Sequence, residues 1–187
     1  VTAFHLDEYI GIPETHPASL RHYLYDHFVH RIAQPVSFVP IDGMAKVDDE
    51  IKRVSDLIAN RHIAVCFAGI GENGHLAFND PPANFETAAP YISVMLDQGY
   101  RERQWRSGLF ATLQDVPERA ISMSIQQIMK SDLIVVPVFG THKARAVKDA
   151  VEGPISPLHP ASILQNHDHV FLLTDSDAAS QLMQSRI

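Results

Sequence analysis

The sequence predicts an α/β fold, in which helices cover both faces of a mostly parallel sheet. Strand-like and helix-like segments alternate along most of the chain, the pattern produced by helical crossovers between parallel strands. Two short apolar runs, 63–68 and 132–139, lack alternating polar residues, as strands buried on both faces do. Together these observations predict a three-layer, Rossmann-like architecture.

Size and composition limit the classes of protein that the chain can represent. Its 187 residues, 45% of them apolar, suit a single globular domain spanning 1–187. A net charge of -7 argues against nucleic acid as the main partner. No apolar run approaches the length of a membrane span, and no signal peptide is visible. The single cysteine, Cys66, lies in an apolar run and cannot form an internal disulfide, so we expect an inert core residue and a reducing, cytoplasmic setting.

The first half of the chain reads as three strands and two helices. A strand over 1–6 would end just before Asp7, with a loop through Gly11 and Pro13. A helix would begin near Pro17, which suits a first helical turn, and apolar residues recur at helical spacing as far as Ile32. The remaining elements are expected to be a strand at 36–41, a helix at 47–61 and the central strand at 63–68.

The second half continues the alternation. Thr141 is expected to cap the helix that ends at Gly153. The expected elements are strands at 91–96, 120–124, 132–139 and 170–174, and helices at 100–106, 125–129, 141–151, 160–166 and from 176 onward. Because the chain begins with Val1 inside a strand-like run, we expect that the domain lacks its N-terminal part.

Polar clusters follow three of the predicted strands. They begin at Asp7, at Glu72 and at Thr141, and the carboxyl ends of parallel strands form the edge where α/β proteins bind ligands. His75 is the best acid/base candidate, because imidazole titrates near neutral pH, and Asp80 could orient it. Lys143 opens a helix after a glycine, where an ammonium group and helix N–H groups favour phosphate.

Each of these residues also has a purely structural interpretation. The glycines 69, 71 and 74 could form only a tight turn, and His75 could be a packed histidine with a satisfied hydrogen bond. Lys143 could lie on a solvated helix face. The histidines between 16 and 30 are not spaced to share one helix face, so no metal site is predicted there.

Four segments resemble the glucosamine-6-phosphate deaminases, also called isomerases. Leu6-Asp7-Glu8-Tyr9-Ile-Gly-Ile-Pro13 is similar to their LDEYxGLP segment, and Gly69-Ile-Gly-Glu-Asn-Gly-His-Leu-Ala-Phe-Asn-Asp-Pro81 to their GxGxDGHxAFNEP loop. Lys143-Ala144 with Ala150-Val-Glu-Gly153 resembles their KAxAxxxAVEG helix. The segment 160–167 resembles their SxLQxH motif, so the likeness covers nearly the whole chain.

The resemblance implies an enzyme that converts glucosamine 6-phosphate and water to fructose 6-phosphate and ammonia without a metal or other cofactor. Asp7 would move a proton between C2 and C1 of the open-chain sugar, and His75 would open the ring with support from Asp80. Lys143 would bind the 6-phosphate. A phosphate-binding arginine is expected among residues 101, 103 and 106, and Arg103 is our choice.

Two substitutions distinguish this loop from the family pattern. Asn73 stands where the deaminases usually carry Asp, and Asp80 is one methylene shorter than their Glu. Asn73 therefore belongs with the candidate catalytic residues, and Gly71 and Gly74 with the candidate substrate-binding ones. Two other functions stay open, a 6-phosphogluconolactonase-like hydrolase and a non-catalytic sugar-phosphate-binding protein. The sequence also leaves open whether the chain forms a homo-oligomer.

Overall fold

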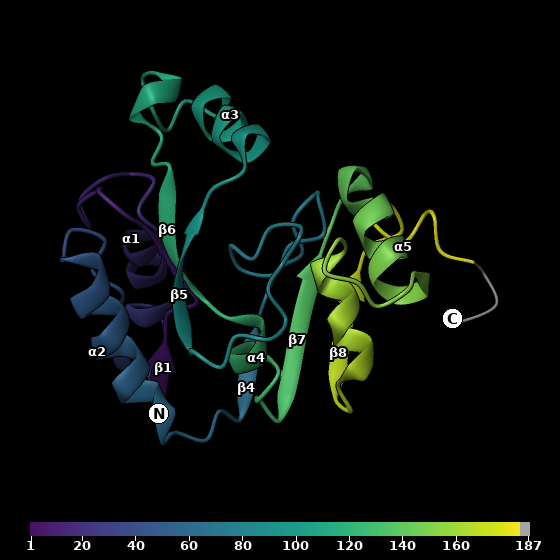
Figure 1. Cartoon of the computed structure of the whole chain (residues 1–187), viewed down its shortest axis with the longest axis horizontal. Coiled ribbons are helices and arrows are strands. Elements are labelled where there is room, and N and C mark those ends of the chain that lie inside the picture. The colour runs from purple at the N-terminus through teal and green to yellow at the C-terminus, as the bar shows by residue number, and fades with distance from the viewer. Residues whose placement is uncertain (184–187) are drawn as a thin grey trace. The chain divides into compact units, whose positions relative to one another are not determined.

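The computed structural model describes residues 1–183, which form two compact units (Figure 1). Unit 1 comprises residues 1–61 and 90–123, and unit 2 comprises residues 62–89 and the chain from 124 onward. Parallel strands with intervening helices confirm the predicted α/β class. The interpretation of 1–187 as a single domain stays a prediction.

Unit 1 contains two small sheets. The parallel pair is β1 (Thr2–Phe4) with β3 (Ser37–Val39), and the antiparallel sheet is β2 (Asp7–Tyr9), β6 (Arg119–Met123) and β5 (Tyr91–Met95), in that order. Its helices are α1 (Leu20–Leu24), which continues as a π-helical turn (Tyr25–Val29), α2 (Val47–Ala59), α3 (Gln98–Arg106) and a 3-10 turn (Leu113–Asp115). Val54 and Ile58 of α2 are buried, and α2 packs against β5.

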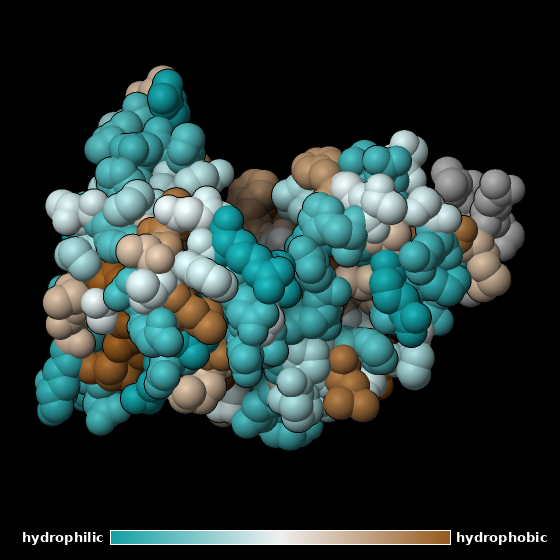
Figure 2. Space-filling model, turned by 90° about the horizontal axis from the view of Figure 1, so that it is seen from above, coloured by the Kyte–Doolittle hydropathy of each residue, from teal (hydrophilic) through white to brown (hydrophobic). Residues whose placement is uncertain are grey.

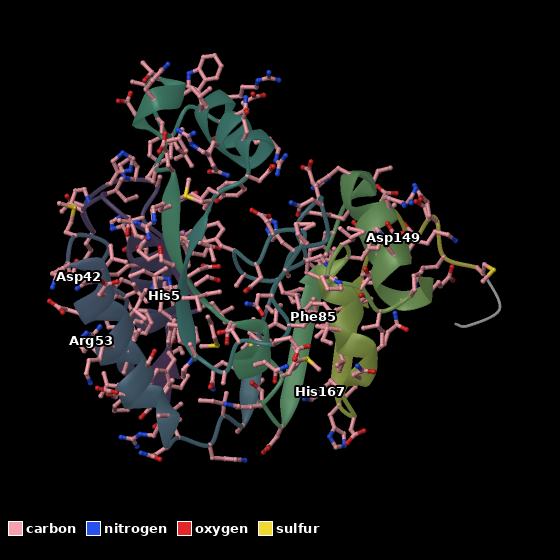
Figure 3. The ribbon with its side chains drawn as sticks, in the orientation of Figure 1. His5, Asp42, Arg53, Phe85, Asp149 and His167 are labelled. Atoms are coloured by element: carbon pink, nitrogen blue, oxygen red, sulfur yellow. The ribbon has the colours of Figure 1, made fainter. Side chains whose placement is uncertain are left out.

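The beginning of the chain differs from the prediction of one strand over 1–6. The structure has two strands there, and Asp7 opens the second instead of following the first. β1 pairs with β3, whereas β2 pairs with β6, so the chain changes sheets at His5 and Leu6. The Tyr91 hydroxyl donates a 2.7 Å hydrogen bond to the carbonyl oxygen of His5, which is labelled in Figure 3.

Unit 2 is built on a parallel sheet. Its strands lie in the order β4 (Val65–Phe67), β7 (Leu133–Val138) and β8 (Val170–Thr174). Its helices are α4 (Ile125–Ile128), a 3-10 turn (Thr141–Lys143), α5 (Ala144–Glu152) and a 3-10 helix (Pro160–Asn166). His167, labelled in Figure 3, ties the end of the last helix to the sheet, because its Nε2 lies 2.7 Å from the Ser131 carbonyl oxygen.

One face of this sheet is buried and the other is exposed, so the predicted burial of the 63–68 strand on both faces is wrong. Cys66, Ile134 and Val136 point into the core, and burial raises the pKa of the Cys66 thiol to about 11. Phe67 on the opposite face is 66% exposed, and Phe171 is 60% exposed. We call this opposite side the open apolar face; it comprises Val65, Phe67, Leu133, Val135, Pro137, Phe171 and Leu173.

Two predicted helix features are absent. α5 begins after a 3-10 turn, and neither element has a side-chain cap, so Thr141 is not the expected cap; Gly153 does end the helix. Residues 176–182 form turns and a bend and not the predicted terminal helix, whose last residues lie outside the described chain. No helix within 1–183 is long and apolar enough to cross a membrane. The surface seen in Figure 2 is mostly hydrophilic, with apolar residues scattered among polar ones.

Candidate active site

The loop over residues 69–80 in unit 2 folds back on itself just after β4. The Gly71 N–H donates to the His75 carbonyl at 3.0 Å, and the Gly74 N–H donates to the Gly71 carbonyl at the same distance. Gly74 has a φ of +84°, a left-handed conformation that a side chain makes costly. The two glycines therefore shape a tight turn that presents His75, and their predicted contact with substrate stays a prediction.

Gly71 also makes room for the imidazole ring. A Cβ built at Gly71 would lie 2.3–2.4 Å from three atoms of the His75 ring. No real side chain accepts such a contact, so the ring occupies the space that the missing side chain leaves. The backbone at Gly71 and the position of the ring are thereby linked.

His75 is held by the carboxylate predicted to orient it. The His75 Nδ1 lies 2.8 Å from Asp80 Oδ1, and both side chains are mostly buried. The Asn73 amide Nδ2 donates to the same Asp80 oxygen at 2.9 Å, and Asn73 Oδ1 accepts from the His75 N–H at 3.2 Å. The structure thus brings these three candidate residues into contact, and their joint catalytic role stays a prediction.

This arrangement bears on the tautomer of His75. An ionised Asp80 only accepts hydrogen bonds, so its contact with the ring would place a proton on Nδ1. Asn73 carries no charge, but it donates to Asp80 and fixes the carboxylate beneath the ring. A carboxylate-oriented imidazole of this kind is typical of enzymes that use general acid/base catalysis.

Lys143 reaches the same loop from the end of the 3-10 turn before α5. Its Nζ donates to the Ile70 carbonyl oxygen at 2.7 Å, and the side chain is half-buried. The backbone turn there needs Gly140, which has a φ of +90°. The predicted phosphate ligand is therefore directed toward the first residues of the glycine loop, within the same unit as His75.

Asp7 lies in unit 1, as the first residue of β2, paired with Ser122 of β6. Burial, followed by the neighbouring charge of Glu8, raises the pKa of the Asp7 carboxyl to about 7. A carboxyl group in this range can both accept and return a proton near neutral pH, which is what general acid/base catalysis requires. Because Asp7 and His75 belong to different units, their convergence on one edge stays a prediction.

Glu8 has a structural task that the sequence did not suggest. Its side chain is buried and accepts hydrogen bonds from the Ser19 hydroxyl at 2.7 Å, the Leu20 N–H at 3.2 Å and the Arg21 N–H at 2.7 Å. These groups surround the start of α1, whose N–H groups lack partners inside the helix. Glu8 therefore anchors α1 to β2 while its charge acts on Asp7.

Arg103, the chosen phosphate ligand, lies on α3 in unit 1. Its guanidinium carbon is 5.9 Å from the centroid of the Tyr100 ring. Arg101 points elsewhere, because its Nη2 donates to the Val116 carbonyl at 3.0 Å. Tyr100, the partner of Arg103, was not singled out from the sequence. Its own neighbour Tyr9 did carry a sequence signal, because Tyr9 lies two residues after Asp7 and thus on the same strand face.

A cavity of about 290 Å³ in unit 2 lies beside the loop but away from its acid/base pair. Glu72, Asn73 and Gly74 line it, whereas His75, Asp80 and Lys143 do not. Its other polar residues pair among themselves, since Asp149 of α5, labelled in Figure 3, contacts both Arg145 and His159. The cavity is therefore lined by two of the predicted site residues, Asn73 and Gly74, but not by the acid/base pair or the lysine. Within the described residues, no group of three His, Cys, Asp or Glu side chains is arranged to hold a metal ion.

The fold and the loop define a class first: an α/β protein whose strand-end loop holds an oriented imidazole, with a lysine directed at the same loop. Comparison then gives the family. The model of the glucosamine-6-phosphate isomerases/6-phosphogluconolactonase family matches residues 1–172, and the chain belongs to this family.

The relatives are consistent with the deaminase branch. The chain is 39% identical over 183 residues to a glucosamine-6-phosphate deaminase of Streptococcus uberis, covering 97% of this chain and 76% of that protein. It superposes on a monomeric glucosamine-6-phosphate deaminase with a TM-score of 0.87 and 33% identity, covering 96% and 74% of the two chains. The expected likeness to the deaminases is therefore confirmed.

The second branch of the family shares the fold. A 6-phosphogluconolactonase from Trypanosoma brucei superposes with a TM-score of 0.72, covering 96% of this chain and 73% of the other, at 16% identity. At that identity the superposition shows the common fold alone.

Proposed function

We propose that the protein is an amino-sugar-phosphate isomerase/deaminase that converts glucosamine 6-phosphate and water to fructose 6-phosphate and ammonia. The observation that carries the proposal is the His75–Asp80 pair, with Nδ1 and Oδ1 2.8 Å apart, in a loop of the deaminase pattern. The 39% identity to a deaminase supports the same substrate class.

In the proposed reaction His75 acts first, on the ring form of the sugar. Ring opening needs a proton removed from the C1 hydroxyl and one delivered to the ring oxygen. Nε2 of His75 is suited to this exchange, because Asp80 holds the other ring nitrogen and stabilises the imidazolium that forms. The product of this step is the open-chain aldehyde.

Asp7 acts next in the proposal. Its carboxylate takes the proton from C2 and returns it to C1, while the C1 oxygen gains a proton as the nitrogen loses one. Together these transfers convert the C1 aldehyde and C2 amine into a C1 alcohol and a C2 imine. Water then adds to the imine carbon and ammonia leaves, giving the C2 ketone. A pKa of about 7 suits a group that must alternately accept and donate the same proton.

The 6-phosphate is assigned to Lys143 and Arg103. An ammonium and a guanidinium are the side chains best suited to a phosphate dianion, and the guanidinium can bind it in a bidentate manner. No metal or redox cofactor has a role in this proposal.

The test measures ammonia and fructose 6-phosphate together, with glucosamine 6-phosphate as the substrate. Equal amounts of both products are expected. Hydrolysis of 6-phosphogluconolactone without ammonia release would instead identify a lactonase. Binding of the sugar phosphate without turnover would identify a binding protein. His75→Gln is the matched control, since it keeps a polar side chain but removes the exchanging nitrogen.

A further inference from the structure

Two tyrosine hydroxyl groups meet in unit 1, close to the proposed base. Tyr9 of β2 is 1% exposed, and its hydroxyl is hydrogen-bonded to the hydroxyl of Tyr100 on α3. The ring centroids are 6.4 Å apart, and the ring planes are inclined by 32°. Phe110 packs edge-on against Tyr9 at 6.1 Å. The pair therefore joins a helix to a strand by one polar contact within an aromatic cluster.

Asp7 lies on the same side of β2 as this pair. Side chains alternate along a strand, so Asp7 and Tyr9 point to one face. Burial raises the pKa of Tyr9 to about 12, and the Asp7 charge contributes to that rise. Both hydroxyl groups keep their protons near neutral pH, since the pKa of Tyr100 is raised as well, chiefly by burial.

Other contacts also hold α3 within unit 1. None of its side chains is fully buried, and most of them are polar. Its start is capped by Asp97, which accepts from the Tyr100 N–H at 2.9 Å, and Arg101 ties it to the Val116 carbonyl. Tyr100 is the α3 residue whose hydroxyl contacts Tyr9 of β2, the strand of Asp7.

Tyr100 also contacts the arginine chosen for phosphate. The guanidinium of Arg103 lies over the Tyr100 ring, one helical turn along α3, at a distance suited to a cation–π interaction. One tyrosine thus contacts Arg103 through its ring and Tyr9 through its hydroxyl. Tyr100 thus contacts both Tyr9 and Arg103.

We propose that the Tyr9–Tyr100 pair is a positioning device that holds Arg103 at a fixed distance from Asp7. The inference rests on the proposed function and deepens it. In a hexose phosphate the C6 phosphate and the C1–C2 proton transfer lie at opposite ends of the carbon chain. A group that binds one end is useful only if its separation from the group that acts on the other end is fixed.

The first experiment needs no substrate. Trp105 is the only tryptophan of the chain, and it lies on α3 with 41% of its surface exposed. In Tyr100→Phe and in Tyr9→Phe we expect lower Trp105 anisotropy and stronger acrylamide quenching than in the wild-type protein. Far-UV circular dichroism and urea unfolding show that each variant remains folded. Tyr23→Phe is the control, because Tyr23 is 56% exposed and lies outside the pair.

The second experiment measures kinetics with glucosamine 6-phosphate. Each variant is expected to raise KM roughly two- to tenfold, the loss expected for one hydrogen bond, and to change kcat less than about twofold. The double variant is expected to be no worse than either single one, because both changes break the same contact.

The outcomes separate the positioning role from its alternatives. Unchanged anisotropy, quenching and KM in Tyr100→Phe would overturn the proposal, since ring packing alone would then hold α3. A fall in kcat confined to Tyr100→Phe would also overturn it, because the hydroxyl would then act on substrate directly. If the wild-type protein showed no turnover, the proposed function would fail. The fluorescence comparison would still support or overturn the part of the proposal in which the Tyr9–Tyr100 contact holds α3 in place.

Discussion

Gly71 shows how a single residue can link backbone shape to chemistry. The imidazole of His75 lies where a Cβ of residue 71 would be, and the same residue donates its N–H to the His75 carbonyl. The loop thus makes room for the proposed acid/base group by leaving out one side chain.

Gly71→Ala is expected to displace the His75 ring and to lower kcat by roughly 10²-fold or more, because proton transfer depends on the position of the ring. Steady-state kinetics with glucosamine 6-phosphate measure the effect. Gly69→Ala is the control, since a Cβ there meets nothing within 4 Å. Equal losses in both variants would show that the loop needs flexibility and not space for the ring.

Asp7 gives a pH-dependent prediction. The base must be ionised to remove the C2 proton, so kcat/KM is expected to rise with pH through about 7, the raised pKa of this carboxyl. Asp7→Asn should remove this limb and reduce C2–H exchange with D₂O by roughly 10²- to 10⁴-fold, measured by NMR. Exchange that is unchanged in Asp7→Asn would exclude Asp7 as the base.

The same carboxyl should affect folding stability. Its pKa is about 7 in the folded protein against an ordinary value of 3.8, so the folded state holds this proton more tightly. The free energy of unfolding therefore falls as pH rises between these two values, and Asp7→Asn should lack that contribution. Urea unfolding of both proteins at pH 5 and pH 8 measures the difference.

At this scale the sequence was informative about pairs that are close in the chain. His75, Asp80 and Asn73 lie within eight residues, so a turn was enough to bring them together. The pKa of Asp7 could not be predicted, because it depends on burial that only the folded chain creates. Tyr100 was missed for a similar reason, since its partner Tyr9 lies 91 residues away.

Among the elements, α1 shows the clearest dependence on one side chain. It has five residues, none fully buried, and Glu8 accepts hydrogen bonds from three groups at its start. Packing and helix propensity alone would hold so short a helix poorly.

Glu8→Ala is expected to lower the free energy of unfolding by about 3 kcal/mol, because buried donors would lose a charged acceptor. Chemical denaturation measures the change. Glu14→Ala is the control: Glu14 pairs with Arg21 at the surface, and its loss should cost less than about 1 kcal/mol. A similar small cost for Glu8→Ala would mean that water replaces the carboxylate at the start of α1.

Periodicity predicted most elements and missed those that depend on distant partners. The strand at 91–96 and the helix at 47–61 were placed to within about two residues, because their patterns are local. The division of 1–9 between two sheets was missed, since it depends on pairing with β3 and β6. The apolar run 63–68 suggested burial on both faces because composition alone does not show which face is covered.

At the scale of the whole molecule, the family and the α/β class follow from features spread along the chain. The family model matches residues 1–172, and the chain spans 76% of the length of the streptococcal deaminase it resembles. The α/β class was predictable because alternation of strands and helices survives small errors in their limits. The arrangement of antiparallel β2, β6 and β5 was not, because hydropathy does not encode strand direction.

The open apolar face of the β4–β7–β8 sheet has a consequence for the behaviour of the chain in solution. Aromatic and aliphatic side chains that are exposed together favour association with other apolar surfaces, because water is released when the two surfaces meet. We expect this chain to increase the fluorescence of the dye 1-anilinonaphthalene-8-sulfonate and to be retained on a phenyl column. We also expect it to aggregate more readily as its concentration rises. Phe171→Ser should weaken all three effects, whereas Met44→Ser, at an exposed position in unit 1, should not.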